Sequence, residues 1–155
     1  MKSLTSLKKS LSAKQSAGCA AFKALFEEHL YSSQDRCVVE MHELLQSRQV
    51  SAQEALAVIK PHVKQGCEYP PSHRVKALQV LGWLTGHLQG AAASALMEDC
   101  ASAKWKERLK RIATESYSPP LQQAVAVLLY RWALAHRSHD WGVGFQQALW
   151  DLEAE

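Results

Sequence analysis

The densest run of charged side chains in this sequence lies between residues 102 and 112. Five basic side chains stand there against a single acid, Glu107. They are Lys104, Lys106, Arg108, Lys110 and Arg111. Ammonium and guanidinium groups orient carboxylates and phosphates through charge-assisted hydrogen bonds. The run therefore predicts a surface for an acidic peptide or an anionic lipid headgroup, with the solvated outer face of a helix as the plainer alternative.

A second basic run opens the chain, because residues 1–26 hold five lysines and no acid. Leu4, Leu7 and Leu11 fall on one side of a helical wheel, with Lys8 beside them and Lys9 opposite. Together with Lys2 these residues form a candidate membrane-contact segment that would lie in the interfacial plane. A flexible or packed extension over residues 1–20, or a mitochondrial transit peptide, are the alternatives.

Signatures of metal binding and catalysis are missing from the sequence. The seven histidines give only one helical i, i+3 pair, His136 and His139, and the four cysteines form no CxxC pair. There is no GxSxG, P-loop or HExxH motif. We therefore expect no metal, no cofactor and no enzymatic activity, with four reduced thiols in a cytosolic protein.

Bulk composition indicates one soluble globular domain. The chain has 155 residues, of which 47% are hydrophobic, and a formal net charge of +3. No stretch approaches the ~18–20 apolar residues of a membrane span. The small net charge excludes a protein whose partners are set by overall charge, so the local basic runs carry the functional hypotheses.

Helical periodicity recurs along the chain, whereas alternating strand patterns are nearly absent. Helices are predicted near residues 18–31, 35–48, 51–63, 73–89, 90–100, 102–114, from 119 to at least 132, and 145–152. Asp35 is predicted to cap the second of them, and Ser51 with Glu54 to form a capping box on the third. Pro61 should kink or end that third helix early. Gly82 and Gly86, inside the fourth, predict close approach of a neighbouring helix.

The fold class is therefore all-α, with about eight helices and short connections, typical of a stacked superhelix or a compact bundle. The order of the segments resembles a VHS domain, from the ENTH/VHS superfamily, over about residues 22–152. Ser33-Gln34-Asp35 resembles the acidic start of that family's second helix. Further stretches resemble family patterns in the same order: ALAVIK at 55–60, ALQVL at 77–81, SAKWKERL at 102–109, LYRWA at 129–133 and ALWDL at 148–152.

The resemblance implies a right-handed superhelix of eight helices over residues 21–155 and no catalysis. It also implies a role as an adaptor in endosomal or Golgi trafficking, with ubiquitin bound on the second and fourth helices. The corresponding face here is Arg36, Val39, Glu40 and Glu43. Arg36 stands where ubiquitin-binding relatives carry tryptophan, so a solvated i, i+4 ion pair with Glu40 is the alternative.

The same resemblance implies a groove for acidic-dileucine sorting peptides between the sixth and eighth helices. Its predicted residues are Lys104, Lys106, Arg108, Lys110, Phe145, Leu149 and Trp150. Such a ligand requires a positive charge beside apolar pockets. The alternative is that Trp105 and Leu109 belong to the core and that the charges form an ordinary outer face.

The expected partners are proteins or peptides, with peripheral membrane contact, including phosphatidylinositol binding, through the basic N-terminus. Nucleic acid is not expected as a partner. The expected location is the cytoplasm, in part on endosomal or Golgi membranes. Two alternatives stay open: a superhelix of the polymerase-tail-binding type that recognises phosphopeptides, and a helical structural subunit of a larger assembly.

Overall fold

The computed structural model describes residues 17–115 and 118–153, and every regular element in them is helical. In chain order they are α2 (Ala17–Ser32), α3 (Asp35–Gln46), α4 (Ala52–Ile59), the 3₁₀ turn η1 (Lys60–His62), α5 (Pro71–His87), α6 (Gly90–Cys100), α7 (Ala103–Glu115), α8 (Pro119–Ala135) and α9 (Asp140–Glu153). The predicted all-α class and the predicted eight helices are confirmed over the described residues. The right-handedness of the superhelix stays a prediction.

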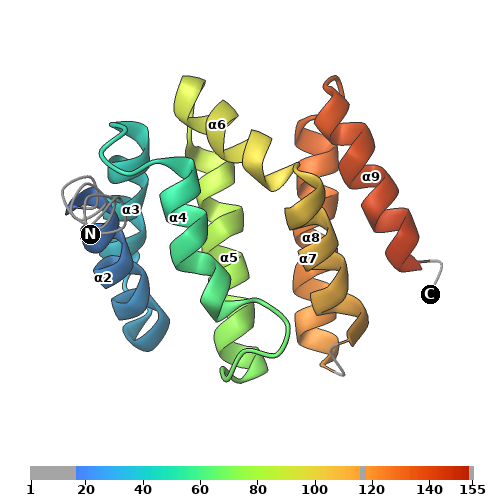
Figure 1. Ribbon diagram of the computed structural model, residues 1–155, viewed down its shortest axis with the longest axis horizontal. Coiled ribbons are helices and arrows are strands. Elements are labelled where there is room, and N and C mark those ends of the chain that lie inside the picture. The colour runs from blue at the N-terminus through green and yellow to red at the C-terminus, as the bar shows by residue number, and fades with distance from the viewer. Residues whose placement is uncertain (1–16, 116–117, 154–155) are drawn as a thin grey trace, which may run out of the picture.

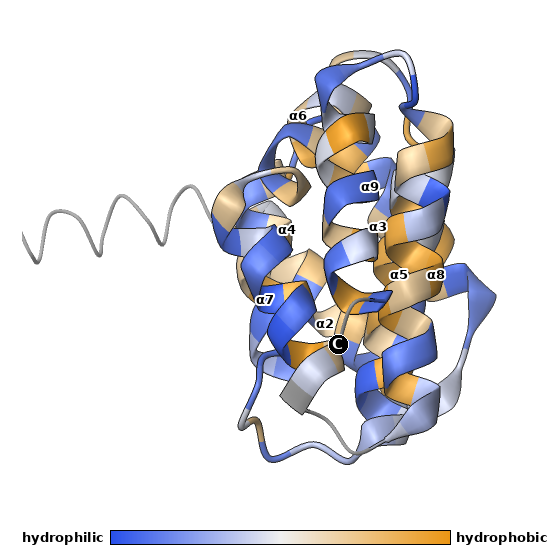
Figure 2. Cartoon of the chain, turned by 90° about the vertical axis from the view of Figure 1, so that its right-hand side faces the viewer, coloured by the Kyte–Doolittle hydropathy of each residue, from blue (hydrophilic) through white to orange (hydrophobic). Residues whose placement is uncertain are grey.

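The helices stack along the long axis of the molecule on two sides (Figure 1). α2, α4, α6 and α7 follow one another on one side, whereas α3, α5 and α8 gather on the other (Figure 2). α9 packs on α8 and closes the C-terminal end. The α3–α5–α8 side and the α7–α9 end are the two regions in which the functional hypotheses fall.

Local sequence explains where the helices begin and end. Ser51 accepts a hydrogen bond from the Glu54 amide at 3.1 Å, and the Ser51 amide donates to the Glu54 carboxylate at 3.0 Å. This is the predicted capping box. α4 ends at Ile59, and Pro61 lies in the 3₁₀ turn that follows, because proline has no amide to continue the α-helical bonding.

Two local predictions were wrong. Asp35 is not the N-cap of α3: Gln34 holds that position without a side-chain hydrogen bond, and Asp35 is the first helical residue. Its carboxylate there complements the positive end of the helix dipole. The last helix, predicted to span residues 145–152, begins earlier: α9 starts at Asp140, so Gly142 and Gly144 lie within it and not before it.

One apolar core runs through the stack and holds the helices together. Its fully buried side chains include Phe22, Phe26, Met41, Leu84 and Leu109. Burying each such side chain contributes about 1.5–3 kcal/mol. Trp105 and Leu109 of α7 are 7% and 0% exposed, so the predicted core role of these two residues is confirmed.

Candidate functional site

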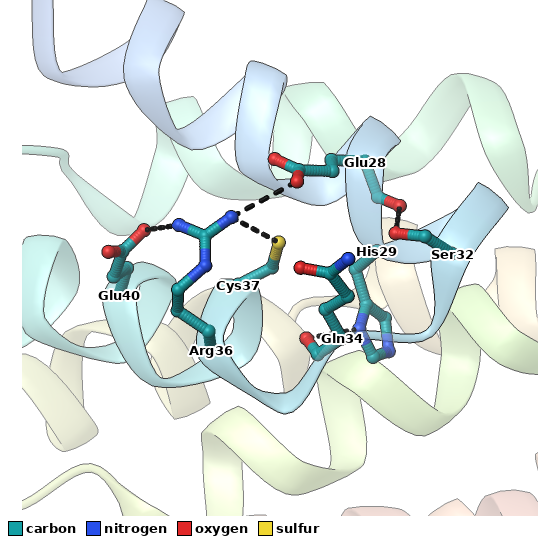
Figure 3. Close-up of polar contacts among 7 residues, drawn as sticks. All are labelled: Glu28, His29, Ser32, Gln34, Arg36, Cys37 and Glu40. Carbon is teal, nitrogen blue, oxygen red and sulfur yellow. Dashed lines mark hydrogen bonds and ion pairs between the residues drawn. The ribbon is translucent and has the colours of Figure 1, made fainter.

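The predicted ubiquitin-type face lies on the outer surface of α3. Arg36 donates from one guanidinium nitrogen to Glu40 at 3.0 Å and from the other to Glu28 of α2 at 3.0 Å (Figure 3). The carboxylates of Glu40 and Glu28 raise the pKa of the Arg36 guanidinium. The predicted i, i+4 ion pair is therefore present, and a second carboxylate from the neighbouring helix fixes the guanidinium from the other side. Glu43 is exposed on the same helix.

A shallow hollow borders this face between α3 and α5. Its volume is about 410 Å³. It is lined by His29, Asp35, Val38, Val39, Gln79, Val80 and Trp83. Val39 is 46% exposed, which is high for an apolar side chain, and it shares the hollow with the Trp83 indole of α5. An exposed aliphatic group beside an indole is a surface on which an apolar patch of a partner can be buried.

A larger groove runs between α5 and α8, and the sequence analysis did not identify it. Its volume is about 620 Å³. α5 lines it with Val75, Leu78, Gln79, Gly82, Trp83, Thr85, Gly86 and His87, and α8 with Pro120, Gln123, Ala124, Val127, Leu128, Arg131, Trp132 and Ala135, followed by the C-cap His136. Trp83 and Gln79 border both hollows, so the two are neighbours along one side of the molecule.

The glycines of α5 were the sequence signal for this groove. At Gly82 an added Cβ would lie 3.2 Å from Cδ1 of Leu128, so α5 and α8 approach closely there, as predicted. At Gly86 no heavy atom lies within 4 Å of an added Cβ. No neighbouring helix therefore packs against Gly86, which leaves open space above the α5 backbone. The prediction of a close helix approach at Gly86 was wrong.

Two of the basic side chains of α7 form ion pairs within the protein. Lys110 lies 3.3 Å from Asp151 of α9 and 3.5 Å from Glu107. Arg111 also pairs with Glu107, at 3.6 Å. Hydrogen bonds, first from Gln147 and then from Lys110, hold the pKa of the Asp151 carboxyl below its usual value. Of these contacts, the pair between Lys110 and Asp151 connects α7 to α9.

The remaining basic residues of α7 differ in their surroundings. The Arg108 guanidinium lies 4.6 Å from the centroid of the Trp105 ring, in a cation–π contact, and burial lowers its pKa. The Lys106 ammonium lies against Gly144 of α9. Lys104 is exposed. The predicted anionic-ligand surface therefore consists largely of side chains that already contact α9 or each other.

The apolar half of the predicted dileucine groove is part of the core. Phe145 is fully buried, with its ring centroid 5.0 Å from that of Trp132, and Leu149 is 8% exposed. Trp150 alone of the three is open, at 55%. The structure thus brings the predicted residues of α7 and α9 together, but as a packed contact between two helices. Phe145 and Leu149 offer little surface to a ligand.

The described residues contain no group of three or more His, Cys, Asp or Glu side chains placed to hold a metal. His136 is the C-cap of α8, but burial and then the neighbouring His139 lower the pKa of its imidazole, which disfavours the protonated form that would complement the helix dipole. Over residues 17–115 and 118–153, no helix is long and apolar enough to cross a bilayer. The membrane-contact candidates Lys2, Leu4, Leu7, Lys8, Lys9 and Leu11 lie outside the described residues.

A solved structure shares this arrangement of helices: the VHS and FYVE tandem domains of Hrs, a protein involved in membrane trafficking and signal transduction. It matches with a TM-score of 0.71, and the match covers 86% of this chain. The chain has a VHS-like fold. The identity is 19%, and the match spans 60% of the Hrs structure. No family model matches the sequence, and no curated protein matches it.

Within the VHS-like fold, α3 and α5 take the places of the second and fourth predicted helices, and α7 and α9 those of the sixth and eighth. The two predicted binding regions can thus be compared directly. The α3–α5 region presents exposed apolar surface beside a hollow. The α7–α9 region presents mainly paired charges over a buried core.

Proposed function

We propose that this protein is a non-catalytic binding module of membrane trafficking that recognises ubiquitin through α3 and α5. The observation that carries the proposal is Val39, 46% exposed at the edge of a hollow of about 410 Å³ that it shares with Trp83. The VHS-like fold, found in a trafficking protein, supports it. The proposed location is the cytoplasmic surface of endosomal or Golgi membranes, reached through the protein partner.

The charged residues of the face define the rim of this surface. Arg36 is held by Glu28 and Glu40, so its guanidinium plane is oriented before a partner arrives, and less side-chain entropy is lost on binding. A planar guanidinium can lie against an apolar patch in place of the tryptophan found in relatives. Glu40 and Glu43 would then contact the partner at the periphery, where charges steer association more than they add affinity.

An acidic-dileucine peptide bound between α7 and α9 receives less support. Phe145 and Leu149 are buried and Lys110 is paired with Asp151, so the apolar pockets that such a ligand requires are filled and the cation nearest to them already has a partner. The same pairing weakens the phosphopeptide hypothesis based on α7. The structural-subunit hypothesis and peripheral lipid contact through residues 1–20 stay predictions.

Amide chemical shifts test the proposal. Titrating unlabelled ubiquitin into the ¹⁵N-labelled protein should move resonances of α3 and of α5 near Trp83. Val39→Asp should abolish these changes, because it places a charge in the apolar part of the surface. Val143→Asp, at a 70% exposed valine of α9, is the matched control and should leave them unchanged. No shift at millimolar ubiquitin, or equal effects of the two variants, would contradict the proposal.

A further inference from the structure

We propose that the groove between α5 and α8 is a second binding site, for a short peptide that carries apolar side chains next to a carboxylate. It adjoins the hollow beside the α3 face at Gln79 and Trp83, but it does not rest on ubiquitin recognition. The class of ligand is the one predicted for α7 and α9, but the proposed site lies between α5 and α8. The volume of the α5–α8 groove, about 620 Å³, falls within the ~300–1,000 Å³ range of ligand pockets.

The floor of the groove is low because Gly82 and Gly86 are one helical turn apart on the same face of α5. Leu128 of α8 covers Gly82, whereas the space above Gly86 is open to beyond 4 Å. An apolar side chain of a ligand can therefore reach the helix backbone at Gly86. Val127, 40% exposed on α8, forms part of the facing wall.

The polar atoms of the floor already have partners inside the protein. The Trp132 indole donates to Oγ1 of Thr85 at 2.8 Å. The Thr85 hydroxyl in turn lies 3.0 Å from the carbonyl oxygens of Leu81 and Gly82, to which it can donate. A ligand atom over this floor gains no hydrogen bond from these groups, which favours apolar side chains there.

The charges around the groove indicate which charge the ligand should carry. Aspartate and glutamate are absent from its lining, and Arg131 is the lining residue with a permanent charge. Arg131 is exposed, and among the described residues it makes no ion pair, unlike Arg36, Lys110 and Arg111. An arginine without an internal partner beside apolar surface is suited to a bidentate bond with a ligand carboxylate. Charge complementarity therefore selects an acidic peptide over a basic or neutral one.

Fluorescence anisotropy with one labelled peptide tests this site. The probe is a synthetic decapeptide with three acidic residues followed by two leucines, added to the full-length protein. Replacing either its leucines by alanine or its acids by amides should weaken binding at least tenfold. Arg131→Gln should weaken binding of the original probe equally, and Gly86→Leu should do so by filling the groove.

Both protein variants are expected to fold. Gly86 has ordinary helical geometry and open space at Cβ, and Arg131 is on the surface. Lys104→Gln, at an exposed lysine of α7, is the matched control for Arg131→Gln, and this variant should bind the probe normally. Val39→Asp should also bind it normally while losing ubiquitin, so failure of one proposal can be told from failure of the other.

Several results would overturn the inference. Normal binding by both Arg131→Gln and Gly86→Leu would exclude the groove, and loss of binding by Lys104→Gln would return the site to α7. A phosphorylated version of the probe that bound far more tightly would identify a phosphopeptide site instead. Sedimentation as a dimer that Gly86→Leu disrupts would show that a second copy of this chain fills the groove.

Discussion

The α7–α9 end and the α5–α8 groove contain similar residue types in different arrangements. On α7, Lys110 is paired with Glu107 and Asp151, and Phe145 and Leu149 of α9 are buried. On α8, Arg131 has no such partner in the described part of the chain and stands beside open apolar surface. Charge density alone therefore does not identify a binding surface, because several of the α7 charges already have partners within the molecule, whereas Arg131 of α8 makes no ion pair among the described residues.

Truncating an apolar residue of α9 should separate a structural helix from a ligand-binding helix. Phe145→Ala should lower the free energy of unfolding by about 3–5 kcal/mol, because it leaves a cavity against Trp132. Trp150→Ala, at a 55% exposed side chain, should cost less than Phe145→Ala by a clear margin. Urea unfolding followed by circular dichroism measures both. Equal decreases in the free energy of unfolding for the two variants would mean that α9 does not pack on α8 through Phe145.

The contact between α9 and the C-terminal end of α8 should also be sensitive to an added methyl group, although less so. At Gly142 a Cβ would overlap the carbonyl of His136, so Gly142→Ala should cost about 1–3 kcal/mol through backbone displacement. The change in thermal midpoint relative to the unmodified protein measures it. An unchanged midpoint would show that α9 can move away from α8, contrary to the packed arrangement.

A histidine pair in the N-terminal half is a further example of groups that satisfy one another internally. His62 Nδ1 and His73 Nε2 lie 3.0 Å apart, and both rings stack with Tyr69. Burial lowers the pKa of both imidazoles. A nearby positive group lowers each pKa further: His73 acts on His62, and Lys76 acts on His73. Glu27 acts in the opposite direction on His62, and Lys23 in the same one.

These lowered pKa values predict how stability depends on pH. The folded state favours neutral imidazoles, so below the unfolded-state pKa of about 6.5 the unfolded chain binds more protons. The stabilisation is present above that pH and is lost as the pH falls toward the lowered folded-state values. Melting temperatures between neutral and mildly acidic pH should decline, and His73→Phe should decline less steeply. Parallel curves for the two proteins would refute this assignment.

The smallest predicted effect concerns the floor of the groove. Gly86→Ala should raise the free energy of unfolding by about 0.5–1 kcal/mol, because alanine loses less backbone entropy in a helix and meets no neighbour here. The same substitution is therefore expected to stabilise the protein at the open Gly86 and to destabilise it at the packed Gly142. Destabilisation by Gly86→Ala would mean that the space above Gly86 is already occupied.

The sequence predicts the elements of this fold well, because they depend on local chemistry. Helix periodicity, the Ser51–Glu54 capping box and the break at Pro61 all act within a few residues and appear as expected. The VHS-like order of the segments followed from the same patterns and is confirmed. Asp35 was placed one residue off, because aspartate is favourable both as an N-cap and in the first turn of a helix.

The binding surfaces were less predictable, because they depend on pairings between distant segments. Lys110 and Asp151 are 41 residues apart, and no local pattern indicates that they neutralise each other. The opposite functions of Gly82 and Gly86 depend on where α8 crosses α5. Exposure of Val39 and burial of Phe145 likewise follow from helix packing, although both residues fit an apolar helical face in the sequence.

The most direct test of the account is a map of amide chemical shifts on the labelled full-length protein with the acidic leucine decapeptide. The account predicts that the largest changes fall at Gly82, Gly86 and Arg131, on the two walls of the α5–α8 groove. Changes centred instead on Lys104, Lys106 and Trp150 would contradict it, because they would place ligand recognition at the α7–α9 end.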